Sequence, residues 1–211
     1  MKAYRPETNS FSSGQVLGEA YESQKAKVVA MEMADAMALK LVSKGLVASQ
    51  VVLGVAYDVG NITDPKRRSV FRGEVTTDYY GRQAPKGVHG AAGFDSPTSS
   101  SRIITEAVGK LYDNLVSPDL LVRRLNVTVN GVVPAAKVQT ESVQLDLFAD
   151  PDEVNRECEE RQSKLDKEHR LQEAQVAVKR RFGKNAVLKG LNFEEGATAK
   201  DRNKQIGGHK A

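Results

Sequence analysis

The chain of 211 residues is poor in the side chains that form disulfides and metal sites: it has one cysteine and three histidines. Because a disulfide needs two thiols, the single Cys158 excludes an internal disulfide and a cysteine-rich zinc site. Long apolar runs are also absent, which excludes a membrane-spanning helix. The first residues lack the apolar segment that a signal peptide needs. We therefore expect a cytoplasmic protein that binds no structural metal and no membrane.

Common catalytic motifs are absent from the sequence as well. The segment Phe182–Gly190 contains a Gly-Lys pair, but neither the spacing nor the Ser/Thr of a phosphate-binding loop. Asp58 and Asp95 each follow a predicted strand, but phosphoryl transfer needs clustered carboxylates to hold Mg²⁺, and two isolated Asp residues on loops are a weak signal. We predict that this chain contains no catalytic residue, no metal site and no cofactor.

Charge is unevenly distributed along the chain. Residues 1–140 carry 17 basic and 13 acidic side chains, residues 141–178 carry 5 and 11, and residues 179–211 carry 9 and 3. A mildly basic body is thus followed by an acidic segment and a basic end. This asymmetry favours a polyanionic partner; the alternative is a solvated surface whose charge is merely uneven.

The hydrophobic pattern predicts an α+β domain of two layers over residues 11–135. Residues 22–46 and the segment that follows Ser96–Ser101 as far as Pro118 have the periodicity of amphipathic helices. The predicted buried stripe of the first helix consists of Val28, Met31, Ala34, Ala38 and Leu41. Strands are predicted at residues 11–17, 51–57, 70–80, 88–94 and 121–129, with loops at 58–68 and 81–87.

These elements predict a four- to five-stranded sheet with two helices on one face. In the last strand, Leu125, Val127 and Val129 alternate with Arg124, Asn126 and Thr128. We therefore expect the second face of the sheet to carry Ser, Thr, Asn, Gln and Arg side chains. A polar face of this kind is suited to lie on a phosphate backbone.

Outside this domain the sequence changes in character. Residues 1–10 are polar and are predicted to be a linker, residues 136–150 a tether, and residues 151–211 a charged tail that is helical or disordered. The tether contains Gln144-Leu145-Asp146-Leu147-Phe148, an apolar cluster with no neighbouring core segment. We expect these five residues to bind a pocket of a partner; the alternative is that they fold back on their own domain.

The pentapeptide resembles the motif by which bacterial replication and repair proteins bind the sliding clamp. Together with the domain before it, the chain resembles the C-terminal part of Y-family translesion DNA polymerases of the UmuC/DinB (ImpB/MucB/SamB) group. The stretches that carry this resemblance, in order along the chain, are Ser12–Leu17, Met31–Asp35, Ala56–Asp58, Pro97–Ser100, Val122–Leu125, Gln144–Phe148, Phe182–Gly190 and Arg202–Lys210.

This resemblance implies the little-finger fold, which packs its sheet against the DNA major groove beside the palm, fingers and thumb domains. It implies that the palm, with its Mg²⁺-binding carboxylates, would lie upstream of Met1, and that residues 1–10 are the linker from the thumb. The chain is then expected to be an isolated domain or a fragment of a split or truncated gene. Its family is a DNA-directed DNA polymerase, but the chain alone should be inactive.

For DNA we expect contacts to the phosphates, because lesion bypass in the damage (SOS) response must tolerate any sequence. About four phosphate contacts would give a log–log salt slope near −3 to −4. For the serine run the alternative is ordinary helix capping, and for Arg67-Arg68 we favour a solvated loop. The residues predicted to contact DNA are Ser13, Gln15, Lys86, His89, Ser99, Ser100, Ser101, Arg102, Arg123, Arg124 and Thr128.

Two other functions remain open at this point. The main interpretation is that the chain is part of a polymerase, holds primer–template DNA and binds the clamp. The alternatives have no polymerase partner: the chain is then a free-standing nucleic-acid-binding module, or a regulatory module that competes for the clamp. Paired exposed aromatic residues of the RNA-recognition type are lacking, which counts against an RNA adaptor. Lesion specificity and oligomeric state have no signature in the sequence.

Overall fold

Four long strands form the main sheet of the computed structural model, which describes residues 9–77, 81–138, 151–206 and 209–210. All neighbouring strands are antiparallel, and a short fifth strand pairs with the beginning of β2. The predicted four- to five-stranded sheet is thereby confirmed. In spatial order the strands are β1 (Ser10–Tyr21), β6 (Val122–Asn130), β2 (Leu46–Tyr57) and β5 (Val88–Thr98), with β7 (Val133–Pro134) as the fifth.

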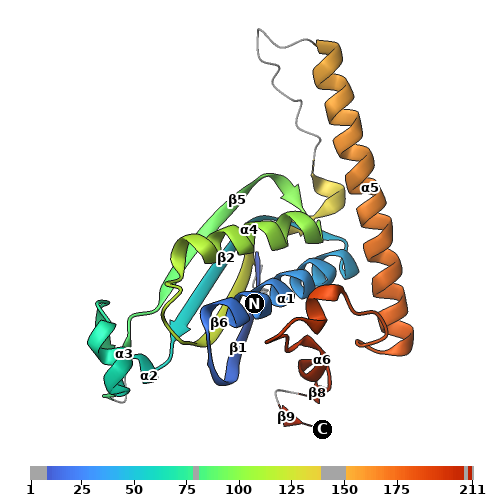
Figure 1. The fold of residues 1–211 in the computed structure, drawn as a ribbon. Helices are drawn as coiled ribbons and strands as arrows, with labels where there is room; N and C mark the ends of the chain where they lie inside the picture. Colours follow the sequence, from blue (N-terminus) through green and yellow to red (C-terminus); the bar gives the residue numbers. More distant parts are fainter. Residues whose placement is uncertain (1–8, 78–80, 139–150, 207–208, 211) are drawn as a thin grey trace, which may run out of the picture.

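Two helices cover one face of this sheet, as predicted (Figure 1). Helix α1 (Ser23–Ser43) ends before Gly45, whose φ of +64° suits a residue without a Cβ atom. Helix α4 (Ser101–Leu115) begins after Ser100, whose hydroxyl accepts a hydrogen bond from the Ile103 N–H at 3.2 Å. Capping, the alternative considered for the serine run, is therefore confirmed at Ser100.

The core lies between these helices and the sheet. The side chains of Leu125, Val127 and Val129 are fully buried in it, which confirms the predicted alternation of β6. On α1 the predicted stripe is only partly correct: Val28 and Met31 are half-buried. The buried positions extend around the helix to Ala26, Val29, Ala30, Met33 and Met37, because α1 is packed on both sides.

The segment between β2 and β5 differs from the prediction. The predicted loop at residues 58–68 contains two short helices, α2 (Gly60–Thr63) and α3 (Pro65–Val70). The Asp64 carboxylate caps α3 by accepting hydrogen bonds from the N–H groups of Lys66 and Arg67 at 2.8 and 3.3 Å. Among the described residues of the predicted strand at 70–80, only β3 (Val75–Thr77) is extended in a sheet, and it pairs with β4 (Gln83–Pro85) outside the main sheet.

The C-terminal tail, defined as residues 151–210, adds a further layer on α1. Its first half is the helix α5 (Pro151–Phe182), seen as a long helix beside the domain in Figure 1. Residues 183–206, for which disorder was one of the two alternatives, contain short helical and extended elements, and residues 190–193 and 199–202 contact α1. The other short elements are η1 (Ala135–Lys137), which precedes the tail, and, within it, η2 (Gly190–Phe193), α6 (Ala199–Arg202), β8 (Gln205–Ile206) and β9 (His209–Lys210).

Within the described ranges, none of the helices combines the length and the apolar composition needed to cross a lipid bilayer.

Candidate nucleic-acid interface

The face of the main sheet opposite α1 and α4 is here called the open face. Strand pairing aligns its side chains in rows that cross the sheet. One row runs Ser12, Thr128, Val52 and Ala91, and its neighbour runs Gly14, Asn126, Gly54 and His89. All of these residues are exposed or half-exposed. Because most of these side chains are small, they project little from the sheet, and the backbone of another molecule can approach the strands closely.

Hydroxyl and amide groups join the rows on the open face. The Thr128 hydroxyl donates to the Ser12 hydroxyl at 2.9 Å, and the Ser12 hydroxyl donates to the Asn126 side-chain oxygen at 3.0 Å. The Asn130 amide donates to the Gln50 side-chain oxygen at 3.2 Å. These bonds fix the orientation of neutral donors and acceptors on a surface that water or a ligand can reach.

Positive charge gathers at one end of the open face. Arg124 is exposed there, paired in register with Val16 on one side and Ala56 on the other. The neighbouring Arg123 is half-buried, and its guanidinium donates to the Gly18 carbonyl at 3.3 Å and lies 3.9 Å from the Asp58 carboxylate. Lys86 is exposed and forms an ion pair with Glu74 at 2.8 Å. Four of the predicted residues, Thr128, His89, Arg124 and Lys86, thus lie on this face or at its end.

The structure places two other predicted residues on the opposite side of the sheet. Ser13 and Gln15 are aligned with the buried Val127 and Leu125, so their side chains face the helix layer. The Gln15 amide donates to the Thr198 hydroxyl at 2.9 Å, and its oxygen accepts from the Arg202 guanidinium at 2.8 Å. Gln15 therefore binds the tail. The residues of this strand that share the open face are Ser12, Gly14 and Val16.

The serine run at the start of α4 is also in contact with the tail. The Glu168 carboxylate accepts hydrogen bonds from the Ser100 hydroxyl at 2.7 Å and from the Arg102 N–H at 2.9 Å. The buried Gln172 amide donates to the Ser99 carbonyl and to the Ser101 hydroxyl, both at 3.0 Å. The positive end of α4 is therefore neutralised by a carboxylate of the same chain. DNA binding at these positions remains a prediction; the partners that the structure gives them are intramolecular.

Glu32 was not singled out in the sequence, yet it is the charged residue most deeply buried in α1, at 2% exposure. Its carboxylate accepts hydrogen bonds from the N–H groups of Thr198 and Ala199 at 2.8 and 3.0 Å and from the Asn192 amide at 2.7 Å. Arg202 lies nearby, and burial lowers the pKa of its guanidinium. A carboxylate between Met31 and Met33, within the apolar part of the helix, was the only signal available for this contact.

The five residues of the predicted clamp motif, Gln144, Leu145, Asp146, Leu147 and Phe148, lie outside the described residues. Within the described part of the chain, no group of three or more His, Cys, Asp or Glu side chains is arranged to hold a metal ion.

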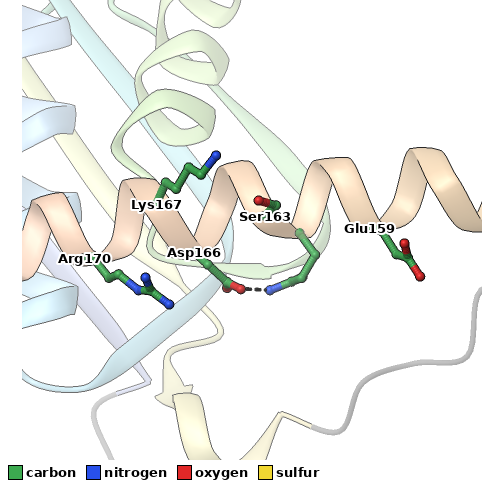
Figure 2. A pocket seen from close by; sticks show the side chains of 6 residues that line it. Glu159, Ser163, Asp166, Lys167 and Arg170 are labelled. Carbon is green, nitrogen blue, oxygen red and sulfur yellow. Dashed lines mark hydrogen bonds between the residues drawn. The ribbon is translucent and has the colours of Figure 1, made fainter.

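A shallow hollow runs along the exposed side of α5 (Figure 2). All of the residues that line it belong to this one helix, and the Gln162 amide donates to the Asp166 carboxylate at 2.8 Å across it. Since no residue of a second helix or strand lines the hollow, polar groups from different elements do not point into it. We assign it no function.

Comparison with known proteins gives one family and several distant structural likenesses. Residues 8–147 match the family model described as the impB/mucB/samB family C-terminal domain. No curated protein matches the chain. A solved structure described as a complex of beta-clamp processivity factor and the little finger domain of PolIV is similar at 12% identity and a TM-score of 0.37, covering 66% of this chain and 99% of that chain. An insertion ternary complex of Dbh DNA polymerase is similar at 8% identity and a TM-score of 0.36, covering 59% of this chain and 28% of that chain.

Proposed function

The chain belongs to the impB/mucB/samB family, because residues 8–147 match the model of that family's C-terminal domain, and we propose that it is the part of a translesion DNA polymerase that holds duplex DNA. The family resemblance seen in the sequence is confirmed by the match. In this proposal the open face lies along the sugar-phosphate backbone of primer–template DNA. Palm, fingers and thumb domains would supply the catalytic residues and Mg²⁺, in the damage (SOS) response.

The observation that supports DNA binding best is that the open face is polar and uncovered, whereas the opposite face of the same sheet is apolar and buried. The rows of Ser, Thr, Asn, Gly and Ala side chains offer oriented hydroxyl and amide groups, and Arg124 offers a guanidinium at their end. Such groups bind phosphates without reading base edges. A polymerase that copies damaged templates needs this kind of contact, because the sequence and the shape of the damaged base vary.

Recruitment would depend on the pentapeptide Gln144–Phe148, which follows the two-layer domain in the sequence. In the proposal, Leu147 and Phe148 fill an apolar pocket of the sliding clamp. Tethering then replaces intrinsic affinity with a high local concentration of DNA. This matters because a face with few charges is expected to bind duplex DNA only weakly.

Duplex binding is tested with the full chain by fluorescence anisotropy on labelled 20-base-pair duplexes of two unrelated sequences. Because Arg124→Gln removes one phosphate contact, we expect roughly five- to tenfold weaker binding and a log–log salt slope that is less negative by about one. The effect should be equal for both sequences. Lys110→Gln, which removes an exposed charge from α4 on the other side of the domain, is the matched control. Equal affinities of the two variants would contradict the proposal.

Clamp binding is tested separately by measuring the affinity of the chain for a bacterial sliding clamp. Leu147→Ala and Phe148→Ala should each cost about 2 kcal/mol, or roughly 30-fold in affinity, because each removes an anchoring side chain. Gln139→Ala, outside the pentapeptide, is the control. An unchanged affinity of the Phe148→Ala variant would remove the clamp from the proposal. Primer extension by the chain alone would show instead that it contains its own catalytic centre.

A further inference from the structure

The segment that connects β2 to β5 is the most basic part of the two-layer domain. We call residues 60–86 the basic arm; its described residues, 60–77 and 81–86, contain α2, α3, β3 and β4. Six basic and three acidic side chains give it a net charge of +3, whereas the whole chain has +4. In Figure 1 the arm projects from the end of the sheet, away from α5.

The base of the arm is fixed to the sheet by a buried amide. Asn61 is fully buried, and its side-chain nitrogen donates to the carbonyls of Asp58 and Leu121, both at 2.9 Å. Its side-chain oxygen accepts from the Leu121 N–H at 2.9 Å. Phe71, only 5% exposed, provides an apolar anchor at the end of α3. The arm is therefore attached rigidly beside the start of β6, so its charges have a defined place relative to the sheet.

That place is the end of the open face where Arg124 lies. The arm leaves the sheet directly after Ala56 and Tyr57 and returns to it at Val88 and His89. Ala56 is paired with Arg124, and His89 is paired with Gly54 on the open face. The charged side chains of the arm thus lie next to the end of the open face, beyond the last residues of β2.

Several basic residues of the arm are exposed, and the Arg72 guanidinium is held on the arm by donating to the Ser69 and Phe71 carbonyls at 2.8 and 3.1 Å. Lys66, Arg68 and Arg72 are exposed, and Arg68 lies over the Phe71 ring with 5.9 Å between the guanidinium carbon and the ring centroid. Two acidic side chains of the arm are engaged elsewhere: Asp64 caps α3 and Glu74 pairs with Lys86. The exposed cations therefore produce a positive potential at the surface, which attracts phosphates.

We propose that the basic arm extends the DNA-binding surface, so that Lys66, Arg68 and Arg72 bind phosphates of the same duplex beyond the end of the sheet. The inference rests on the proposed function of the open face. The structure changes the interpretation of Arg67-Arg68, for which a solvated loop was favoured: these residues belong to a capped helix anchored to the sheet. A rigid basic helix at this position loses less entropy on binding than a mobile loop would.

The test compares three variants of the full chain with the wild type, in the fluorescence anisotropy assay described above. The arm variant carries Lys66→Gln, Arg68→Gln and Arg72→Gln. The control variant carries Lys110→Gln, Lys184→Gln and Lys200→Gln, which remove the same charge from exposed positions on α4 and the tail. Arg124→Gln reports on the sheet. Because each lost phosphate contact changes the salt slope by about 0.9, the arm variant should have a slope less negative by about two to three and bind about tenfold or more weakly at low salt.

The outcomes separate this inference from the function on which it rests. If the arm variant binds like the control variant while Arg124→Gln weakens binding, the arm lies outside the DNA footprint and the inference is overturned, but the open face keeps its function. If neither the arm variant nor Arg124→Gln differs from the control, the proposed function fails and the inference with it. Should the arm variant be less stable, the double variant Lys66→Gln/Arg72→Gln, which leaves Arg68 on Phe71, must still bind severalfold more weakly than wild type.

Discussion

The two faces of the main sheet are made by the same strands but have opposite surroundings. On one side, Leu125 and Val127 of β6 are fully buried beneath α1 and α4, and the tail adds another layer outside α1. On the other side, Asn126 and Thr128 of the same strand remain half-exposed. The alternation of a strand decides which residues face each side, but it does not decide how many layers each side receives.

The layer added by the tail differs in chemistry from the layer formed by α1 and α4. Apolar side chains hold the two helices on the sheet. The tail is held largely by polar contacts: Glu32 with residues around α6, Glu168 with the start of α4, and Lys189 with Asp35. Polar docking surfaces of this kind are typical of contacts between units that also separate. We therefore expect substitutions on the two faces of the sheet to differ in how much they lower the free energy of unfolding. We also expect substitutions at the contacts of the tail to weaken its docking while the two-layer domain stays folded.

The largest effect is expected where the faces differ most. Leu125→Ala leaves a cavity beneath the helices and should lower the free energy of unfolding by about 3 kcal/mol. Thr128→Ala, on the opposite face of the same strand, removes only a half-exposed hydroxyl and should cost less than about 1 kcal/mol. Urea denaturation of both variants measures the difference. Equal losses would show that the open face is covered in solution.

Docking of the tail on α1 should depend strongly on one carboxylate. Glu32→Ala removes the acceptor of four hydrogen bonds, so the docked tail should lose about 2–3 kcal/mol. Hydrogen exchange at residues 186–203 and cleavage of the tail by trypsin should both become faster, while the two-layer domain stays folded. Glu194→Ala, at an exposed position of the tail, is the control. If Glu32→Ala exchanges no faster than this control, other contacts hold the tail.

Alkaline pH should weaken the buried side of the domain. Tyr112 is 2% exposed and its hydroxyl donates to the Ser23 carbonyl at 2.8 Å; burial raises the pKa of this phenol to about 12. The folded state keeps the phenol neutral, whereas the unfolded chain ionises it near pH 10. Its contribution is thus complete below pH 10 and is lost as the pH rises to 12, with a total of roughly 2–3 kcal/mol.

The check is the stability of wild type and Tyr112→Phe measured from pH 8 to pH 11.5. Tyr112→Phe lacks the ionisable group, so its stability should fall less steeply with pH, although it starts lower because a hydrogen bond is lost. Parallel curves for the two proteins would show that Tyr112 is not the group responsible.

The smallest effect is expected at the contact between the tail and α4. Glu168→Gln keeps a hydrogen-bond acceptor near Ser100 and Arg102 but removes the charge that opposes the helix dipole, which should cost about 1 kcal/mol of tail docking. Hydrogen exchange around residues 165–175 measures this loss. Glu173→Gln, which affects only an exposed pair with His169 on α5, should leave exchange in the neighbouring turns unchanged. Similar exchange in the two variants would mean that the charge at α4 contributes nothing.

Much of the fold followed from patterns of neighbouring residues. The alternation of residues 121–129 predicted the two faces of β6, and the periodicity of the segment before Pro118 predicted α4, where Ile104, Val108 and Tyr112 are buried. Both predictions worked because strand and helix periods are properties of short segments. The basic arm was missed for the same reason. The helices α2 and α3 are only 4 and 6 residues long, too short for a periodic pattern, and they depend on Asn61 bonding to Leu121, 60 positions away.

The sequence by itself determined the family, the two-layer domain and the polar character of one sheet face, since these are written in local composition and in motifs. Only the tertiary structure decided that Gln15 and Ser99–Ser101 bind the tail and not an open surface. Their partners, Thr198, Arg202, Glu168 and Gln172, lie 68 to 187 positions away along the chain. Polar contacts over such separations leave no periodic signal, because any donor can meet any acceptor once the core has brought them together.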